Sequence, residues 1–232
     1  MPVWFLLLFS VLPANQSPAA SQGIPKVDFR YSFVPFDRSC SELTETKIEQ
    51  AWIEELESRM DEFRSTWDNG GPALLKAVIE EIGSPFVQSE MIATMTLSNF
   101  RSMSLPLILN VRRHLSSFTD GNPRPMPMFV GLVFHELLHT YVVDHLDKSK
   151  LWEKYKDEPG SVLSHLHLNA LMKMAYLKLG REEELASIVA KDTSIGPIYK
   201  RAWEIVNDLE GHEAFVAELK QQQALAAGGT AK

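Results

Sequence analysis

The chain has 232 residues, of which 45% are hydrophobic and 23% are charged. A chain of this length and composition can bury a sizeable core, which excludes a largely disordered protein. The formal net charge is -7, and the chain has no run of lysines and arginines. We therefore do not expect a nucleic-acid-binding protein.

The N-terminal residues have the pattern of a signal peptide. Residues 3–12 form one apolar run that is too short for a membrane-spanning helix but suits a signal h-region. Ser17 and Ala19 then supply small residues for cleavage. We expect a signal peptide over residues 1–20, a single domain over residues 21–232, and a secreted or periplasmic location, with a bacterial envelope favoured. No membrane span is expected in the mature chain.

The first half of the chain predicts a strand followed by two helices. Residues 26–36 alternate apolar and polar side chains, which is typical of a half-buried strand. Apolar residues at spacings of three and four predict a helix over 41–67. Residues 69–72 read Asn-Gly-Gly-Pro and predict the end of that helix, so a second helix is expected from Pro72 to Ile82.

The second half predicts two strands and then helices only. Residues 90–97 and 105–115 are strand-like, and we expect them to pair as antiparallel neighbours. A proline-rich loop follows at residues 120–127. The expected helices then cover 128–145, 148–156, 161–179, 182–190 and 198–225.

Residues 135–139 read His-Glu-Leu-Leu-His, which is an HExxH pattern within an apolar helix. Residues four apart lie about 40° apart around a helix, so His135 and His139 project from one face and can bind one metal ion. Glu136 then lies where it can accept a proton from a water activated by that metal. Two histidines and a glutamate in a buried helix require such a reason.

The segment from Phe134 to His139 resembles the active-site helix of the zincin superfamily of metallopeptidases. The resemblance implies an α+β fold, mostly helical, with a small antiparallel or mixed sheet preceding the HExxH helix, in a gluzincin-like layout. It also implies that the edge strand of the sheet binds extended substrate, and residues 105–115 are the candidate for that strand.

A catalytic zinc normally has three protein ligands, and three sources compete for the third. His145 has the spacing of the metzincin pattern, but Val142 replaces its glycine, and a continuing helix points His145 away from the metal. In the gluzincin pattern the third ligand is a glutamate on a following helix, but the helix over 161–179 contains no acidic residue. Glu153, Asp157 and Glu158 lie before that helix, and later acids such as Glu204 and Glu210 have an exposed pattern.

The third source is a histidine within the helix over 161–179. His165 and His167 lie about 200° apart on a helix, so one ion cannot take both. His165 shares a face with Asn169, and we favour it as the third ligand.

Further candidates are weaker, because nothing in the sequence selects among them. Possible oxyanion donors are Tyr141, Tyr176, Tyr199 and His212. Asn169 and Asp144 are candidates for orienting a ligand imidazole. Arg112, Arg113 and His114 are candidates for lining a substrate cleft.

The sequence thus predicts a zinc metallopeptidase that hydrolyses a peptide or protein substrate, with Zn²⁺ held by His135, His139 and His165 and Glu136 as general base. The alternative is a catalytically inactive zincin-like metal-binding protein or an envelope interaction protein.

Overall fold

The computed structural model describes residues 23–229, and the predicted signal peptide over residues 1–20 lies outside them. The strands are β1 (Lys26–Tyr31), β2 (Glu90–Thr96) and β3 (Ile108–Asn110). The α-helices are α1 (Arg38–Leu43), α2 (Gln50–Ser58), α3 (Met60–Ile82), α4 (Met126–His145), α5 (Lys150–Lys154), α6 (Gly160–Lys178), α7 (Glu182–Ile195), α8 (Pro197–Glu204) and α9 (His212–Gly229). Short irregular helices are η1 (Phe33–Asp37), η2 (Arg112–His114) and η3 (Ile205–Leu209).

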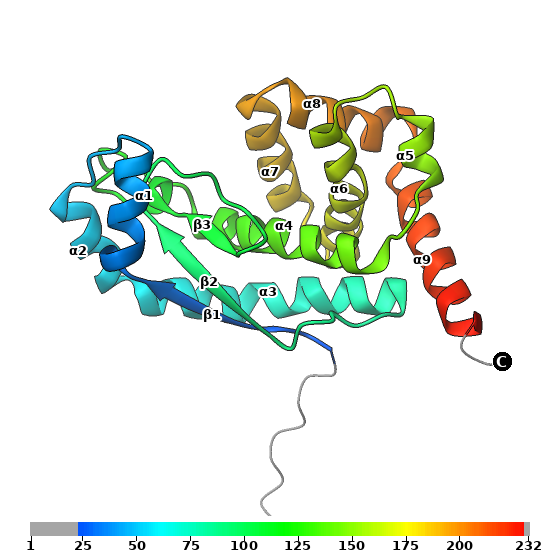
Figure 1. Cartoon of the computed structure of the whole chain (residues 1–232), viewed down its shortest axis with the longest axis horizontal. Coiled ribbons are helices and arrows are strands. Elements are labelled where there is room, and N and C mark those ends of the chain that lie inside the picture. Colours follow the sequence, from blue (N-terminus) through cyan, green and yellow to red (C-terminus); the bar gives the residue numbers. More distant parts are fainter. Residues whose placement is uncertain (1–22, 230–232) are drawn as a thin grey trace, which may run out of the picture.

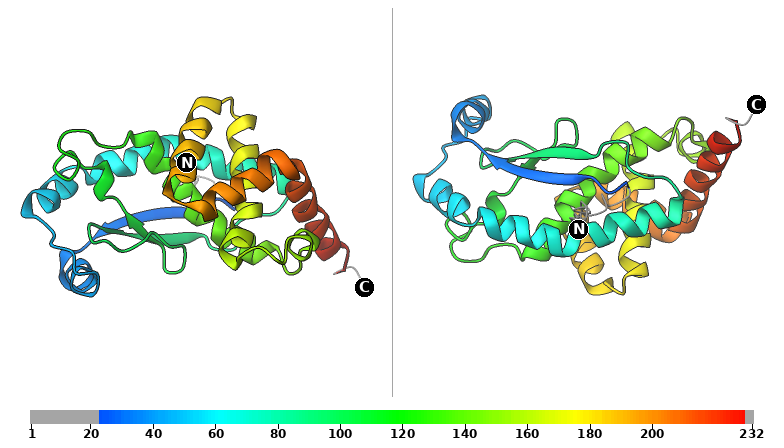
Figure 2. Two further views of the ribbon diagram at one scale, coloured as in Figure 1. Left: turned by 90° about the horizontal axis from the view of Figure 1, so that it is seen from above. Right: turned by 90° about the horizontal axis from the view of Figure 1, so that it is seen from below.

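The elements form a sheet, two long helices against it and a helical lobe (Figure 1). The predicted α+β class is therefore confirmed. The views from above and below show the strands in one layer and α3 in the next (Figure 2). Phe29 of β1 contacts both helices, with ring centroids 5.5 Å from Phe129 of α4 and 6.4 Å from Trp67 of α3.

The three strands form a parallel sheet in the order β1-β2-β3, so the expected antiparallel or mixed sheet is wrong. The parallel direction of β3 relative to β2 is explained by residues 97–107. They form a loop that returns the chain to the start of β3, which then runs alongside β2 from Thr94↔Ile108 to Thr96↔Asn110. The Asn110 side-chain amide stabilises this loop by donating to the carbonyl oxygens of Ser98 and Phe100.

A buried carboxylate holds the start of the same loop. Asp37 is fully buried and accepts hydrogen bonds from the backbone N–H groups of Leu97 at 2.9 Å and Ser98 at 3.3 Å, and from the Thr96 hydroxyl. Buried backbone donors need such partners. The chain can therefore leave β2 sharply without the hairpin that the sequence predicted.

Several predicted boundaries are wrong. In the second half of the chain, the strand expected over 105–115 is limited to β3 and is followed by η2. The strand expected over 26–36 ends at Tyr31, and the helix expected over 41–67 is divided among α1, α2 and the start of α3. The predicted break at residues 69–72 is absent because α3 continues through Pro72. Tertiary packing overrides the local signal here: Gly71 has no Cβ to collide with the Trp67 ring, and Arg181 donates to the Gly70 carbonyl at 3.1 Å.

The helix that carries the HExxH pattern forms as predicted. α4 is packed against α3 on one side and α6 on the other, and Phe134 lies 6.1 Å from the Tyr176 ring. By length and composition α4 is apolar enough to cross a membrane, and 61% of its apolar window is buried. Packing in the protein core accounts for that apolar composition.

The C-terminal half supplies the helical lobe, which is the yellow-to-red part of Figure 1. α6 contacts α4, α8 and α9 and is the central helix of this lobe. The single helix expected over 198–225 is interrupted at Gly211, whose φ of 84° is in the left-handed region that favours glycine. The interruption separates α9 from α8 and η3, so α8 can pack against α6.

Candidate metal centre

Two histidines of α4 form the first half of the centre. His135 and His139 lie one helical turn apart, and their ring centroids are 5.0 Å apart. Both are half-buried, whereas most neighbouring side chains of α4 are fully buried in the core. The apolar helix thus presents its two imidazoles together on one face, as the spacing predicts.

α6 supplies the third histidine. The ring of His165 lies 5.3 Å from His135 and 4.8 Å from His139. The ligating nitrogens of the three residues all lie within 4.8 Å of one another. Residues that are 26 or more positions apart in the sequence therefore meet where α6 packs against α4.

The tautomer of His165 is set by its backbone neighbour. Its Nδ1 atom lies 2.6 Å from the carbonyl oxygen of Ser161, so Nδ1 carries the hydrogen and donates it. The lone pair on Nε2 is then free for a metal ion. Such a hydrogen bond to the second imidazole nitrogen is a usual feature of metal-ligating histidines.

The three imidazoles are held in their neutral form. Burial and then the neighbouring histidines lower the pKa of His135 well below its usual value. Burial followed by the effect of His165 lowers the pKa of His139 to about 4. Burial also lowers the pKa of His165, against the hydrogen bond to Ser161. Neutral imidazole is the form that binds metals, so the site is prepared for a cation at neutral pH.

Glu136 lies beside the histidines and is only 6% exposed. Burial raises the pKa of its carboxyl group to about 8, and the charge of Lys191 only partly opposes this effect. A cation bound by the neighbouring histidines would favour the ionised form. The residue predicted as the general base is therefore in an environment that strengthens its basicity.

Among the four candidate oxyanion donors, only Tyr199 lies at the histidines. Its ring centroid is 4.9 Å from His165 and 6.5 Å from His135. The hydroxyl of Tyr141 instead donates to the Ser84 carbonyl. Tyr176 lies in the core beside Gly131, and His212 lines a separate surface cavity with Glu213.

The competing third ligands lie elsewhere. His145 contacts the carbonyl oxygen of Pro85 at 2.8 Å and the ring of Tyr141, pointing away from the centre as a continuing helix requires. His167 contacts the Glu218 carboxylate at 2.8 Å. Four of the five acids considered form ion pairs elsewhere: Glu153 with Lys156, Glu158 and Glu204 with Arg201, and Glu210 with Lys154.

Some of the other predicted site residues line the cleft at the centre, and others do not. Arg112 and Arg113 do line the cleft at the centre. His114 is buried next to them, with Nδ1 3.2 Å from the Arg124 carbonyl, and burial lowers its pKa to about 4. Asp144 is exposed, and both amide atoms of the buried Asn169 are without hydrogen-bond partners in the described part of the chain. Neither orients a ligand imidazole.

A cleft of about 790 Å³ opens onto this centre. His135, Glu136 and Tyr199 line it together with Asn110, the last residue of the edge strand β3. The cleft also contains residues that the sequence did not reveal, notably Arg101, Arg124, Lys191 and Asp192. No sequence motif marks these residues, because two of them lie in loops and two lie on α7, outside the HExxH helix.

Comparisons of the chain with models of protein families, with curated proteins and with solved structures find no match. The likeness to zincins is therefore confined to the short segment from Phe134 to His139. The candidate site therefore consists of three histidines that meet beside Glu136, and His135, Glu136 and Tyr199 line the cleft.

Proposed function

We propose that this chain is a zinc-dependent metallopeptidase that hydrolyses peptide bonds. The observation that carries the proposal is the meeting of His135, His139 and His165, with ligating nitrogens within 4.8 Å of one another, beside the buried Glu136. The proposed location is secreted or periplasmic, on the strength of the signal-peptide pattern in residues 1–20.

The donor set fits zinc. Three neutral imidazoles on rigid helices, with a cleft on one side, match the three protein ligands and one open position of catalytic zinc sites. Imidazole nitrogens suit zinc better than they suit magnesium or calcium, which take oxygen ligands. A zinc ion held there would polarise a substrate carbonyl and lower the pKa of a water molecule to roughly 7.

The chain's own residues supply the remaining chemistry. Glu136 is positioned to accept a proton from the attacking water and then to deliver it to the leaving amine. Tyr199 is positioned to donate a hydrogen bond to the oxygen on which negative charge develops. The outer edge of β3 is already paired within the chain: Ile108 exchanges backbone hydrogen bonds with Met103, and the Asn110 N–H donates to the Ser102 hydroxyl. Substrate would therefore lie in the cleft that Asn110 lines, without adding a strand to β3.

The test uses the purified mature chain and its Glu136→Gln variant. Elemental analysis should find one zinc per chain in both, and only the wild type should hydrolyse a peptide library. Glu153→Gln, which changes a glutamate of a surface ion pair, is the matched control and should keep full activity. A chain that binds no zinc after reconstitution would overturn the metal site. Zinc binding with no difference between wild type and Glu136→Gln would instead indicate the inactive metal-binding protein.

A further inference from the structure

The arginines of this chain fall into two groups. Six of the ten form ion pairs with carboxylates: Arg30, Arg38, Arg59, Arg64, Arg181 and Arg201. The other four are Arg101, Arg112, Arg113 and Arg124, and all four line the cleft at the candidate metal centre. We call these four the arginine cluster. In a chain with 30 acidic and 23 basic residues, unpaired arginines concentrated in one cleft require an explanation.

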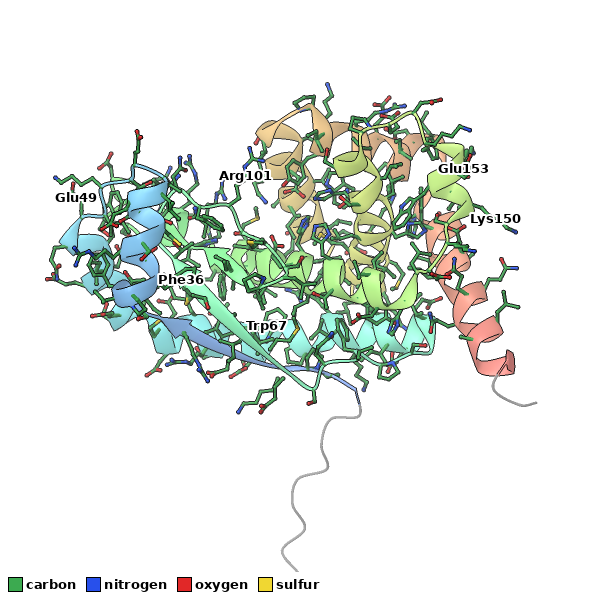
Figure 3. All side chains as sticks on the ribbon, viewed as in Figure 1. Phe36, Glu49, Trp67, Arg101, Lys150 and Glu153 are labelled. Atoms are coloured by element: carbon green, nitrogen blue, oxygen red, sulfur yellow. The ribbon has the colours of Figure 1, made fainter. Side chains whose placement is uncertain are left out.

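Separate segments bring the arginine cluster together. Arg101 extends from the loop after β2 toward α7 (Figure 3), and its charge acts on Tyr199. Arg112 and Arg113 belong to η2, which follows the edge strand β3. Arg124 lies in the loop before α4. The cluster therefore extends from the end of the sheet to the start of the helix that carries Glu136.

Two neighbouring members of the cluster are held in place although their charges repel each other. The guanidinium groups of Arg112 and Arg113 lie 5.0 and 5.9 Å from the ring centroid of Phe118, and Arg112 also donates to the Asn99 side chain. Burial, followed by the charge of Arg113, lowers the pKa of both Arg112 and Arg124. The contacts with Phe118 hold the guanidinium groups of Arg112 and Arg113 over one ring, so the unfavourable proximity of these two like charges is built into the fold.

The cleft has little negative charge of its own to neutralise the cluster. Its two carboxyl groups belong to Glu136 and Asp192. Asp192 already accepts from the Lys191 ammonium at 2.6 Å and from the Trp203 indole at 3.2 Å. Glu136 is assigned to proton transfer. The charge of Asp192 acts on Arg124, but none of the four arginines forms an ion pair with a carboxylate among the described residues that line the cleft.

We infer that the cleft recognises peptides through their carboxylates, and that the arginine cluster is the specificity determinant. This inference rests on the proposed peptidase function and narrows its substrate class. The planar guanidinium group binds a carboxylate through two parallel hydrogen bonds, and that geometry favours a defined ligand over a diffuse charge. The carboxylates come either from acidic side chains next to the cleaved bond or from a free C-terminus.

The experiment measures binding and hydrolysis separately. Fluorescent peptides of one sequence are prepared with glutamate or glutamine beside the cleaved bond, each with a free or an amidated C-terminus. Binding is measured by anisotropy with zinc-loaded Glu136→Gln, which does not turn the peptides over. We expect the carboxylate-bearing peptides to bind at least about tenfold more tightly, since close interfacial charge pairs commonly contribute this much. The preference should weaken as salt increases.

Replacement of two arginines tests the assignment. In the double variant Arg112→Gln/Arg113→Gln, the ratio of affinities for acidic and neutral peptides should fall toward one. The matched control is Arg30→Gln/Arg38→Gln, which removes the same charge from exposed ion pairs and should leave the ratio unchanged. Arg113→Gln alone, at an exposed position, replaces the double variant if that variant does not fold.

The outcomes separate this inference from the proposed function. Equal affinity for acidic and neutral peptides, or a preference that survives loss of both arginines, overturns the inference even if peptides are hydrolysed. Arginine-dependent binding of acidic peptides without hydrolysis supports the inference and overturns the peptidase function. Within a positive result, dependence on the free C-terminus indicates a carboxypeptidase-type substrate, and dependence on glutamate indicates recognition of acidic side chains.

Discussion

The Nδ1 atom of His165 lies 2.6 Å from the carbonyl oxygen of Ser161, one turn earlier on α6. This hydrogen bond leaves Nε2 without a hydrogen and limits rotation of the ring. His165 therefore differs from His135 and His139, whose placement follows from the HExxH spacing alone, because its orientation is set by its own helix.

Replacement of His165 should remove the metal more readily than replacement of any histidine other than His135 and His139. We expect His165→Ala to lose more zinc affinity than the roughly 10–100-fold typical of residues that only support a ligand, because a direct bond is lost. Isothermal titration calorimetry with zinc measures the change.

The matched control for this prediction is His145→Ala. His145 has the spacing of an alternative third ligand but contacts Pro85 and Tyr141 instead. Its replacement should leave zinc affinity unchanged. If His145→Ala loses zinc while His165→Ala retains it, the centre is assembled differently from the arrangement described above.

Tyr199 should affect turnover rather than metal binding. Loss of one donor to a developing oxyanion typically lowers kcat by roughly 10²–10³-fold, and we expect Tyr199→Phe to fall in this range with its zinc content unchanged. Steady-state kinetics on a cleaved peptide gives kcat and KM separately. Tyr141→Phe is the control: it removes a hydrogen bond to Ser84 remote from the cleft and should alter stability only. A wild-type kcat in Tyr199→Phe would exclude its role as a donor.

The parts of the site that the sequence could predict are those fixed by local geometry. His135 and His139 follow from a spacing of four on a helix, and His165 follows from the polar face of the next long helix. Tyr199 could only be one of four candidates, because its approach to His165 depends on how α8 packs over α6. Arg101 could not be placed, since its loop is shaped by hydrogen bonds from residues far away in sequence.

The same distinction explains the fold. Alternating burial in β1 was predictable, since Val27 and Phe29 face the core and the alternate residues do not. The parallel direction of β3 was not, because it depends on contacts made by Asp37 and Asn110 rather than on any turn motif. Helix α3 continues through Pro72 for a similar reason: packing against α4 outweighs the local break signal.

Asp37 should be a main contributor to the stability of the loop over residues 97–107. In Asp37→Asn, an amide N–H₂ replaces an oxygen that faces donors from Leu97, Ser98 and Thr96. A buried donor left without an acceptor costs about 1–3 kcal/mol, and urea unfolding should show a loss of that size. Asp28→Asn, in an exposed ion pair of β1, should change stability by only about 0.5 kcal/mol or less. Equal effects of the two variants would contradict a structural role for Asp37.

Glu55 should make stability depend on pH in the acid range. Its carboxylate accepts from the backbone N–H groups of Ser116 at 2.8 Å and Ser117 at 2.7 Å, and from Arg59 at 2.8 Å. Burial raises its pKa, but the hydrogen bonds from Ser117, Ser116 and Arg59 outweigh that effect and lower the pKa to about 2. A pKa below the ordinary value of 4.5 means that the folded state favours the ionised form. The stabilisation is therefore complete above about pH 4.5 and is lost as the pH falls toward 2.

Glu55→Gln should thus lose about 1–3 kcal/mol of unfolding free energy at pH 7, because charge-assisted hydrogen bonds are weakened. The difference from wild type should shrink as the pH is lowered from 4.5 toward 2, where the wild-type carboxyl group also becomes neutral. Urea unfolding of zinc-free protein at several pH values isolates this effect from metal release. Glu57→Gln changes an exposed glutamate on the same helix and should follow the wild-type curve. A constant difference between Glu55→Gln and wild type across this range would show that the Glu55 carboxylate does not titrate with folding.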